Sequence, residues 1–193
     1  MNRIQLRVQA ESKLRNDRRS HIMEDAKNDI AYLADVLHNI SAKITGAGNG
    51  TFPLTKSSGN KSVGMQSFDS DKLDAGQHMV IDAACIEFGE ALKADNKKPS
   101  EVGFLTAPTA EFLAADVVLK QGNELFRMPV SELCNTSVGV SRDDAYRMIS
   151  HMPIVEASKV FSVYLEFPEG VSLPANAKDY FVKFSVRAHQ LRK

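Results

Sequence analysis

Histidines are the residues of this sequence best suited to acid–base or metal chemistry. Asp74 precedes His78 by four positions, but Gly76 between them disfavours a helix that would hold both side chains on one face. No two histidines form the HxH or HExxH spacing that is common among zinc ligands. We therefore expect solvated or locally hydrogen-bonded histidines and no metal site. The five are His21, His38, His78, His151 and His189.

The two cysteines, Cys85 and Cys134, are candidate nucleophiles. They form no CxxC pair, each lies among apolar residues, and no GxSxG motif is present elsewhere. Pairing between Cys134 and the downstream His151 has no distinctive motif behind it. Asp143 and Asp144 are better explained as acidic residues at the positive end of a helix than as an acid–base pair. We expect free structural thiols in a reducing compartment, no enzyme activity and no cofactor.

Two groups of basic residues could contact phosphate. Residues 1–20 contain six Arg or Lys against two acidic residues, and a second group follows the exposed face of the last apolar run, beside Phe181. The whole chain has 24 basic and 24 acidic residues, which argues against a general nucleic-acid binder. A small-ligand-binding β-sandwich is one alternative function, which only the fold class supports. Nucleic-acid binding is the other. Its candidate contacts are Arg15, Arg18, Arg19, Lys183 and Arg187.

The N-terminal part predicts an amphipathic helix that begins near Ser20, a suitable N-cap. Apolar residues recur there in steps of three and four, which places them in one stripe. The stripe could dock on the body of the protein or pair with the same helix of another copy. These candidate oligomer contacts are Ile22, Ala26, Ile30, Leu33, Leu37 and Ile40.

A glycine- and serine-rich stretch, residues 46–64, follows this helix. It lacks the GxxxxGK[ST] spacing of a phosphate-binding loop, and its composition is typical of a flexible connection. The sequence therefore predicts a helical arm over 1–45, a linker over 46–70 and a β-sandwich domain over 71–193.

Later segments predict mainly short strands. We expect a strand over 78–88, where a helix also fits, and another over 101–106. The stretch 112–130 predicts a hairpin that turns at Gln121–Glu124, although its first limb also fits a helix. A short helix is expected over 141–152, stopped by Pro153. This pattern favours an antiparallel β-sandwich, jelly-roll-like, over a parallel α/β sheet.

The clearest strands close the chain. Phe161, Val163, Leu165 and Phe167 alternate with more polar residues before a Pro–Glu–Gly stop. A second alternating run from residue 180 to residue 188 follows. Strands of this kind pair with distant parts of the chain, so we expect the last one to be a central or closing strand of the sheet.

These two runs carry a family resemblance. From Asn123 onward the sequence resembles the C-terminal half of jelly-roll capsid proteins of tailless bacterial viruses. The matching residues are Phe161–Val163–Leu165–Phe167–Pro168–Gly170 and Tyr180–Val182–Phe184–Val186–Arg187. The resemblance implies a single jelly roll in a virion structural protein. Such a protein self-assembles through its loops and N-terminal arm, without catalytic residues.

The resemblance and the composition together set the expected location and partners. No apolar run approaches the ~20 residues that span a bilayer, and the N-terminus lacks a signal-peptide core. We expect a protein made in a cytoplasm, not secreted, and carried in a virion if it is viral. Its partners would be further copies of itself, other virion proteins and, through the arm, nucleic acid.

Overall fold

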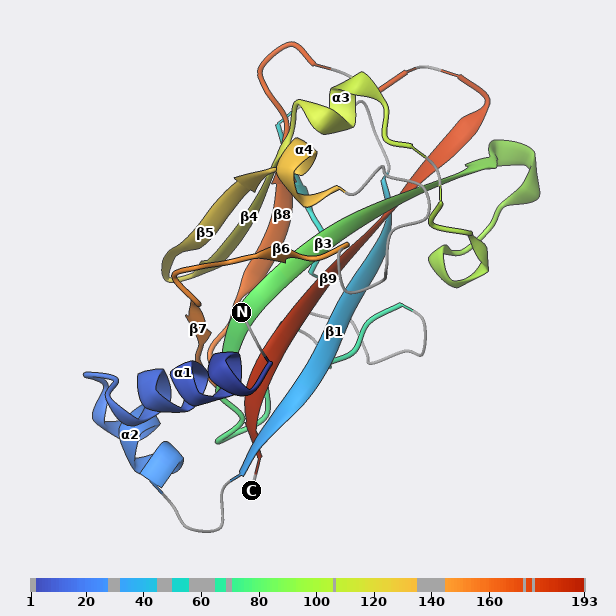
Figure 1. Ribbon diagram of the computed structural model, residues 1–193. Helices are drawn as coiled ribbons and strands as arrows, with labels where there is room; N and C mark the ends of the chain where they lie inside the picture. The colour runs from blue at the N-terminus through green and yellow to red at the C-terminus, as the bar shows by residue number, and fades with distance from the viewer. Residues whose placement is uncertain are drawn as a thin grey trace.

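The protein is mainly β, with two antiparallel sheets and a pair of N-terminal helices (Figure 1). Helix α1 spans Arg3–Arg15 and helix α2 spans Ser20–Lys27. The computed structural model describes residues 3–27, 32–44, 50–55, 65–68, 71–105, 107–134, 145–171, 173–174 and 176–192.

The larger sheet is built on three long strands that run side by side (Figure 1). Its order is β1 (Tyr32–Ile44), β9 (Lys178–Arg192) and β3 (Met79–Leu92). Two short strands, β6 (Arg147–Met148) and β7 (Ile154–Val155), pair with the far side of β3. The last strand of the chain is therefore a central strand, as predicted.

The smaller sheet has four strands in the order β2, β8, β4, β5. They are β2 (Thr51–Pro53), β8 (Ser162–Glu166), β4 (Asp116–Gln121) and β5 (Asn123–Pro129). The predicted hairpin is the β4–β5 pair, and Gly122 at its turn has a φ of 73°. Glycine adopts this left-handed conformation without a steric penalty.

Short helices complete the described elements. α3 (Ala110–Leu113) and α4 (Val130–Leu133) lie together at the upper end of the sheets in Figure 1. The 3-10 turns η1 (Lys93–Asp95) and η2 (Pro99–Glu101) follow β3. These elements connect the two sheets beyond the strand ends.

The strand pairings are nested along the chain. Strand β1 pairs with β9, β2 with β8, β3 with β6 and β7, and β4 with β5. Two further pairings, β3 with β9 and β4 with β8, join these couples into the two sheets. Most of the sheet structure therefore depends on contacts between early and late segments.

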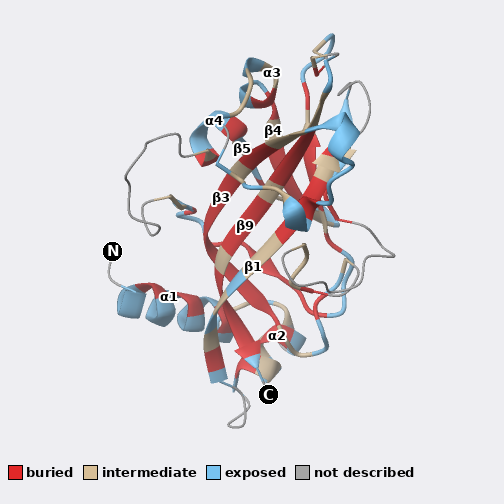
Figure 2. Ribbon diagram, turned by 90° about the vertical axis from the view of Figure 1, so that its right-hand side faces the viewer, coloured by how far each residue is buried: buried red, intermediate tan, exposed pale blue. Residues whose placement is uncertain are grey.

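The main core lies between the two sheets, and β3 and β9 are buried at successive positions over much of their length (Figure 2). Aromatic rings fill its end near α3. The ring of Phe112 lies 4.8 Å from Phe88, 5.6 Å from Tyr180 and 5.8 Å from Phe167, measured between centroids. These tilted and edge-to-face contacts are the preferred arrangements of aromatic pairs.

A second apolar cluster docks the helices on the outer face of the larger sheet. The buried side of α1 is a row of residues at four-residue spacing, which lie one above another on a helix. Figure 2 shows this row turned to the sheet and the rest of α1 exposed. The cluster comprises Leu6, Ala10, Leu14, Ile22, Ala26, Leu33, Val80, Met152, Ile154 and Leu191.

The prediction of one helix over the apolar stripe is wrong from Tyr32 onward, and residues 28–31 lie outside the described residues. Residues 32–44 form strand β1, which pairs with β9 over its whole length. The spacing misled because a step of four also keeps a strand residue on one face, as for Leu33 and Leu37. The step of three to Ile40 changes face, and Ile40 lies in the main core. Strand β1 thus belongs to the larger sheet although it precedes the expected linker.

Two other predicted elements are also wrong. Of the expected strand 101–106, residues 101–105 form no strand and residue 106 lies outside the described residues. The segment packs against Gly89 of β3 and takes no place in a sheet. A Cβ on Gly89 would lie 2.6 Å from Val102 Cγ1, which shows how closely the segment passes. In the expected helix 141–152, residues 141–144 lie outside the described residues, and 147–148 form β6 because they pair with β3.

The predicted strand over 78–88 and the two closing strands are confirmed by β3, β8 and β9. Of the expected linker, residues 46–49, 56–64 and 69–70 lie outside the described residues. Strand β2 falls inside it, and residues 65–68 bond to the edge of β1.

Candidate functional site

A bulge in β3 places a carboxylate on the outer face of the larger sheet. Ile81 pairs with Ala188 and Ala83 pairs with Arg187, so Asp82 is an extra residue between them. Bulges redirect a side chain in this way and are common beside functional sites. Asp82 is only 1% exposed, and its two oxygens lie 3.2 and 3.3 Å from Nε of Arg187. The charge of Asp82 is therefore buried against a guanidinium.

His189 lies between this carboxylate and a second one. Its Nδ1 is 2.8 Å from Oδ1 of Asp35 on β1, and its Nε2 is 3.5 Å from Oδ2 of Asp82. The second distance is too long for a good hydrogen bond, and Nε2 is buried without another partner among the described residues. Asp82 and then Asp35 raise the pKa of His189, although burial acts against them. This geometry favours the charged imidazolium.

A cavity of about 270 Å³ opens beside these groups. The N-terminal turn of α1 and the segment before β6 form its other sides. One part of its wall is apolar, and the other part carries charged side chains. Besides the three residues above and Arg187, its lining includes Arg3, Leu6, Val36, Leu37 and Tyr146.

This arrangement suits binding better than proton transfer. A general base needs a free lone pair within reach of the substrate. Here the Nδ1 of His189 is engaged by Asp35, and the two carboxylates favour the protonated ring. The network can hold a charged group in place, and we name it the outer-face site: Asp35, Asp82, Arg187 and His189.

A second buried histidine lies lower on the same face. His78 is 2% exposed, and its Nδ1 accepts a hydrogen bond from the backbone N–H of Ala157 at 3.1 Å. Nε2 therefore carries the proton, and it donates to Oδ2 of Asp25 on α2 at 3.0 Å. Burial lowers the pKa of His78 more than Asp25 raises it. His78 is thus a neutral link between the sandwich and α2.

Ion pairs fasten the helices beside this link. Glu156, which is 6% exposed, contacts Arg19 before α2, His21 on α2 and Lys159. Burial alone would raise the pKa of Glu156, but hydrogen bonds from Lys159, Arg19 and His21 bring it to about 2. Lys13 of α1 also donates to the backbone carbonyl of His151. Together with the apolar cluster, these contacts hold the helix pair on the sheet.

The predicted oligomer-contact residues do not form one surface. Ile22, Ala26 and Leu33 are buried in the cluster beneath the helices, and Ile40 is buried in the main core. Leu37 on β1 is 57% exposed. The sixth residue, Ile30, lies outside the described residues.

The predicted nucleic-acid contacts are mostly engaged by carboxylates. Lys183 pairs with Glu87 at 2.7 Å, and Arg187 pairs with Asp82. Arg15 pairs with Glu11 at 2.9 Å, Arg19 pairs with Asp17 and Glu156, and Arg18 is exposed. Phe181, which we expected beside the basic stripe as an exposed ring, is 0% exposed. The structure therefore brings no exposed basic–aromatic surface together from these residues.

The other residues considered for chemistry lie in surroundings that suit a structural role. Burial raises the pKa of the Cys85 thiol to about 12, which makes it unreactive at neutral pH. Within the described residues, no three His, Cys, Asp or Glu side chains are grouped to hold a metal ion. None of the helices described here is long and apolar enough to cross a membrane. Both cysteines are free, as expected.

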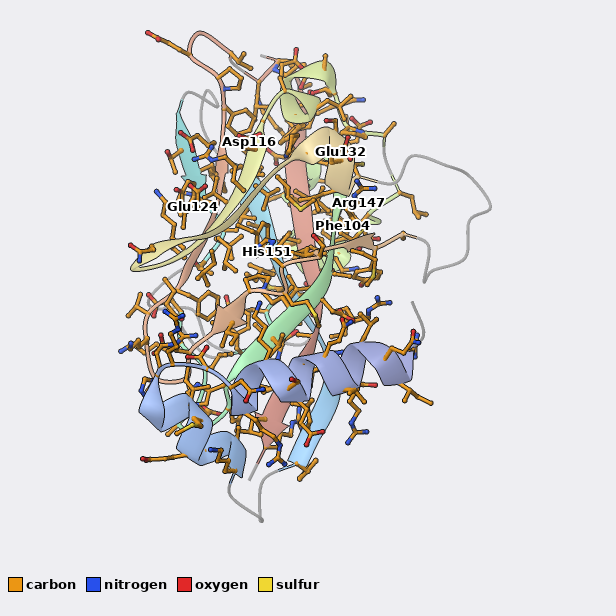
Figure 3. The ribbon with its side chains drawn as sticks, turned by 60° about the vertical axis from the view of Figure 1, so that its left-hand side comes forward. Phe104, Asp116, Glu124, Glu132, Arg147 and His151 are labelled. Carbon is orange, nitrogen blue, oxygen red and sulfur yellow. The ribbon has the colours of Figure 1, made fainter. Side chains whose placement is uncertain are left out.

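Charged groups on the smaller sheet provide an exposed counterpart to the outer-face site. Arg127 on β5 contacts Asp116, Glu124 and Glu166 at 2.8–3.2 Å, and all four side chains are a third or more exposed. Asp116 and Glu124 are labelled in Figure 3. Each exposed ion pair of this kind contributes about 0 to 1 kcal/mol to stability.

The outer-face site was missed by sequence reasoning. An aspartate inside the apolar run 78–88 was a usable signal, because a charge there must be buried with a partner. The partner, Arg187, lies 105 positions away in sequence, and no local pattern connects the two. We expected solvated or locally hydrogen-bonded histidines; His78 and His189 are buried, and their hydrogen-bond partners are distant in the sequence.

Comparisons with known proteins give no family assignment. No protein-family model, curated protein sequence or solved structure matches this chain.

Proposed function

We propose that this chain is a non-enzymatic structural subunit with a jelly-roll architecture, which assembles with further copies of itself into a capsid or another part of a virion. The nested strand pairing supports the architecture. A jelly roll is a long antiparallel hairpin wound into two four-stranded sheets, so that first and last strands pair. The orders β1-β9-β3-β6, with β7 also paired to β3, and β2-β8-β4-β5 support this proposal. Fold alone does not specify function, and the assembly proposal needs its own observation.

That observation is the open edge of β1. The backbone groups of Asn39 and Ser41 point away from β9 and bond to residues 65–68. The direction of the backbone N–H and C=O groups alternates along a strand. The backbone groups of Leu33, Asp35 and Leu37 therefore also point away from β9. In the described part of the chain these groups have no hydrogen-bond partner. An open edge of this kind readily pairs with a strand of another chain.

Exposed apolar side chains accompany this edge. Tyr32 and Leu37 on β1 are each 57% exposed, and Ile4 and Val8 on the outward side of α1 are 70% and 60% exposed. Apolar residues grouped near an unpaired edge favour a protein partner over free solvent. A second copy of this chain supplies the same edge and can pair with it in an antiparallel manner.

Light scattering during size-exclusion chromatography tests the proposal. We expect the full chain to form a defined oligomer at micromolar concentration. The Val8→Lys/Tyr32→Lys double variant should shift it to monomer, because lysine opposes burial of both surfaces. Leu105→Lys is the matched control, since Leu105 is 96% exposed and lies on neither α1 nor β1. A wild-type chain that stays monomeric at high concentration would overturn the proposal.

Nucleic-acid binding is less well supported. Of its five candidate contacts, four are paired with acidic residues within the described structure. Reversing the charge of Arg19 or Arg187 would also leave buried Glu156 or Asp82 without a partner, so a loss of binding would be confounded with misfolding. Arg18→Glu is the cleaner variant, because Arg18 is exposed. Salt-sensitive binding that this variant abolishes would favour the alternative.

A further inference from the structure

The cavity at the outer-face site has the size of a pocket for a small ligand. Its volume of about 270 Å³ lies just below the roughly 300–1,000 Å³ of ordinary ligand sites. Such a volume suits a molecule of about ten non-hydrogen atoms. Leu6 and Val36 give it apolar walls, and Leu37 and Tyr146 lie on its lining.

The charges around the cavity favour an anion. Arg3 and Arg187 are cationic, Asp35 and Asp82 are anionic, and His189 is flanked by both carboxylates. With the imidazole protonated, the lining carries one surplus positive charge. A single negative charge on a ligand would balance it.

The carboxylates themselves are poorly placed to bind a cation. Both oxygens of Asp82 face Nε of Arg187, and Oδ1 of Asp35 faces Nδ1 of His189. A cationic ligand would have to displace these contacts in a buried setting, where losing a partner is costly.

Two donors of the site lack strong acceptors. His189 Nε2 is buried without a hydrogen bond among the described residues. Arg187 uses only Nε for Asp82, and one terminal nitrogen lies 3.2 Å from the thioether sulfur of Met148, a weak acceptor. The guanidinium also lies 5.9 Å from the ring of Tyr146, which holds it in place. A carboxylate oxygen would satisfy such donors with charge-assisted hydrogen bonds.

We propose that this cavity binds a small organic monocarboxylate, with the carboxylate against Arg187 and His189 and the apolar body against Leu37 and Tyr146. The cavity shares Asp35 and Leu37 with the β1 edge, but Val8 and Tyr32, which the assembly test changes, do not line it, so the two proposals can fail separately.

Calorimetric titration with benzoate tests the site, with benzyl alcohol and benzylamine as neutral and cationic counterparts of similar size. We expect saturable one-to-one binding of benzoate and at least tenfold weaker binding of the other two. Benzoate should shift the imidazole NMR signals of His189 and leave those of His78 unchanged. Equal binding of benzyl alcohol, or no one-to-one binding of benzoate, would overturn the proposal.

Leu37→Trp should block the cavity and weaken benzoate binding at least tenfold. The position is 57% exposed, so the larger ring can be accommodated without unfolding. Leu105→Trp is the control and should bind as the wild type does. Unchanged binding by Leu37→Trp would show that benzoate binds elsewhere.

A second variant removes the charge without leaving a buried ion. Asp82→Asn/Arg187→Gln removes both charges of the pair and should abolish benzoate binding, whereas Arg127→Gln should retain it. Binding should also weaken as pH rises and His189 loses its proton. The charged groups that face His189 are Asp35, Asp82, Arg187 and Arg3. Binding that is indifferent to pH between 6 and 9 and to the double variant would exclude this site.

Discussion

His78 and His189 are both almost completely buried on the same sheet face, yet the structure favours the neutral form of His78 and the protonated form of His189. The two lie close along neighbouring strands, since the N–H of Leu191 donates to the carbonyl of His78. His78 gives one nitrogen to a backbone donor and meets one carboxylate, so burial lowers its pKa. His189 lies between two carboxylates, which raise its pKa despite burial. The partners of a buried histidine decide its charge, and burial alone does not.

The two histidines also hold different parts of the molecule. His78 joins α2 to the segment after β7, so it controls the docking of the helices. His189 joins the carboxylates of β1 and β3 to β9, so it controls the cohesion of the larger sheet. The comparison between the two histidines can be tested by substituting either residue or by changing the pH.

The largest effect should come from Asp82→Ala, which removes the carboxylate shared by Arg187 and His189. Breaking a buried pair leaves an uncompensated charge and costs about 3 to 5 kcal/mol. The free energy of unfolding in urea measures this change. Asp116→Ala removes a comparable carboxylate from the exposed Arg127 network and should cost about 0 to 1 kcal/mol. Similar losses for the two variants would mean that the outer-face site is not a stabilising charge cluster.

Acidification should release the helix pair. The pKa of His78 is lowered in the folded protein, so its contribution to docking is complete above the ordinary value of 6.5 and is lost as pH falls below it. Each unit of lowering corresponds to about 1.4 kcal/mol. Amide hydrogen exchange of α1 and α2 at pH 7.5 and 5 measures the release.

The matched variant for this experiment is His78→Gln, whose amide can replace both hydrogen bonds without titrating. The fall in protection factor between pH 7.5 and pH 5, which is corrected for the slower intrinsic exchange in acid, should disappear in it. If the loss of protection persists unchanged, His78 is not the responsible group. His21 and Glu156, which face His78 from the same cluster, would then be examined.

Alkaline pH should remove the stabilising contribution of His189. Because the pKa of His189 is raised, its stabilising contribution is present below 6.5 and is lost as pH rises through the raised value. His189→Gln should abolish this part of the pH dependence between pH 6 and 9 in thermal unfolding. NMR titration of the two imidazoles gives the direct measurement, and a lower pKa for His189 than for His78 would contradict the comparison.

The smallest effect is expected for Arg15→Gln on α1. Arg15 and Glu11 form an i,i+4 pair in which both side chains are 48% exposed, and such pairs contribute about 0.3 to 0.5 kcal/mol. Urea unfolding should therefore change by no more than this. A loss of 2 kcal/mol or more would show that α1 depends on its surface charges as well as on its apolar side.

The strands could be predicted where the spacing of the apolar residues fitted a strand and did not fit a helix. Val163 and Leu165 in β8, and the alternation in β9, admit only a strand, and both are confirmed. The spacing of Leu33 and Leu37 fits a helix and a strand equally well, and these residues form a strand because β1 pairs with β9. Short segments such as β6 owe their structure to the edge of β3, which no local pattern can reveal.

The candidate site was less predictable than the fold. Arg187 and Lys183 were singled out from the sequence as exposed cations, and both are paired with carboxylates of β3. Long-range pairing brings these residues together, and the bulge at Asp82 depends on the register between β3 and β9. Single-sequence patterns contain neither the register nor the bulge.

The central place of β9 has a consequence for how the protein is made. Until residues 178–192 have been synthesised, β1 and β3 lack the strand that lies between them, and their apolar faces remain without a partner. Such distant pairings slow folding to the millisecond-to-second range and extend the time during which the chain can aggregate. The order of synthesis thus makes closure of the larger sheet a late event, and the first strands need protection until then.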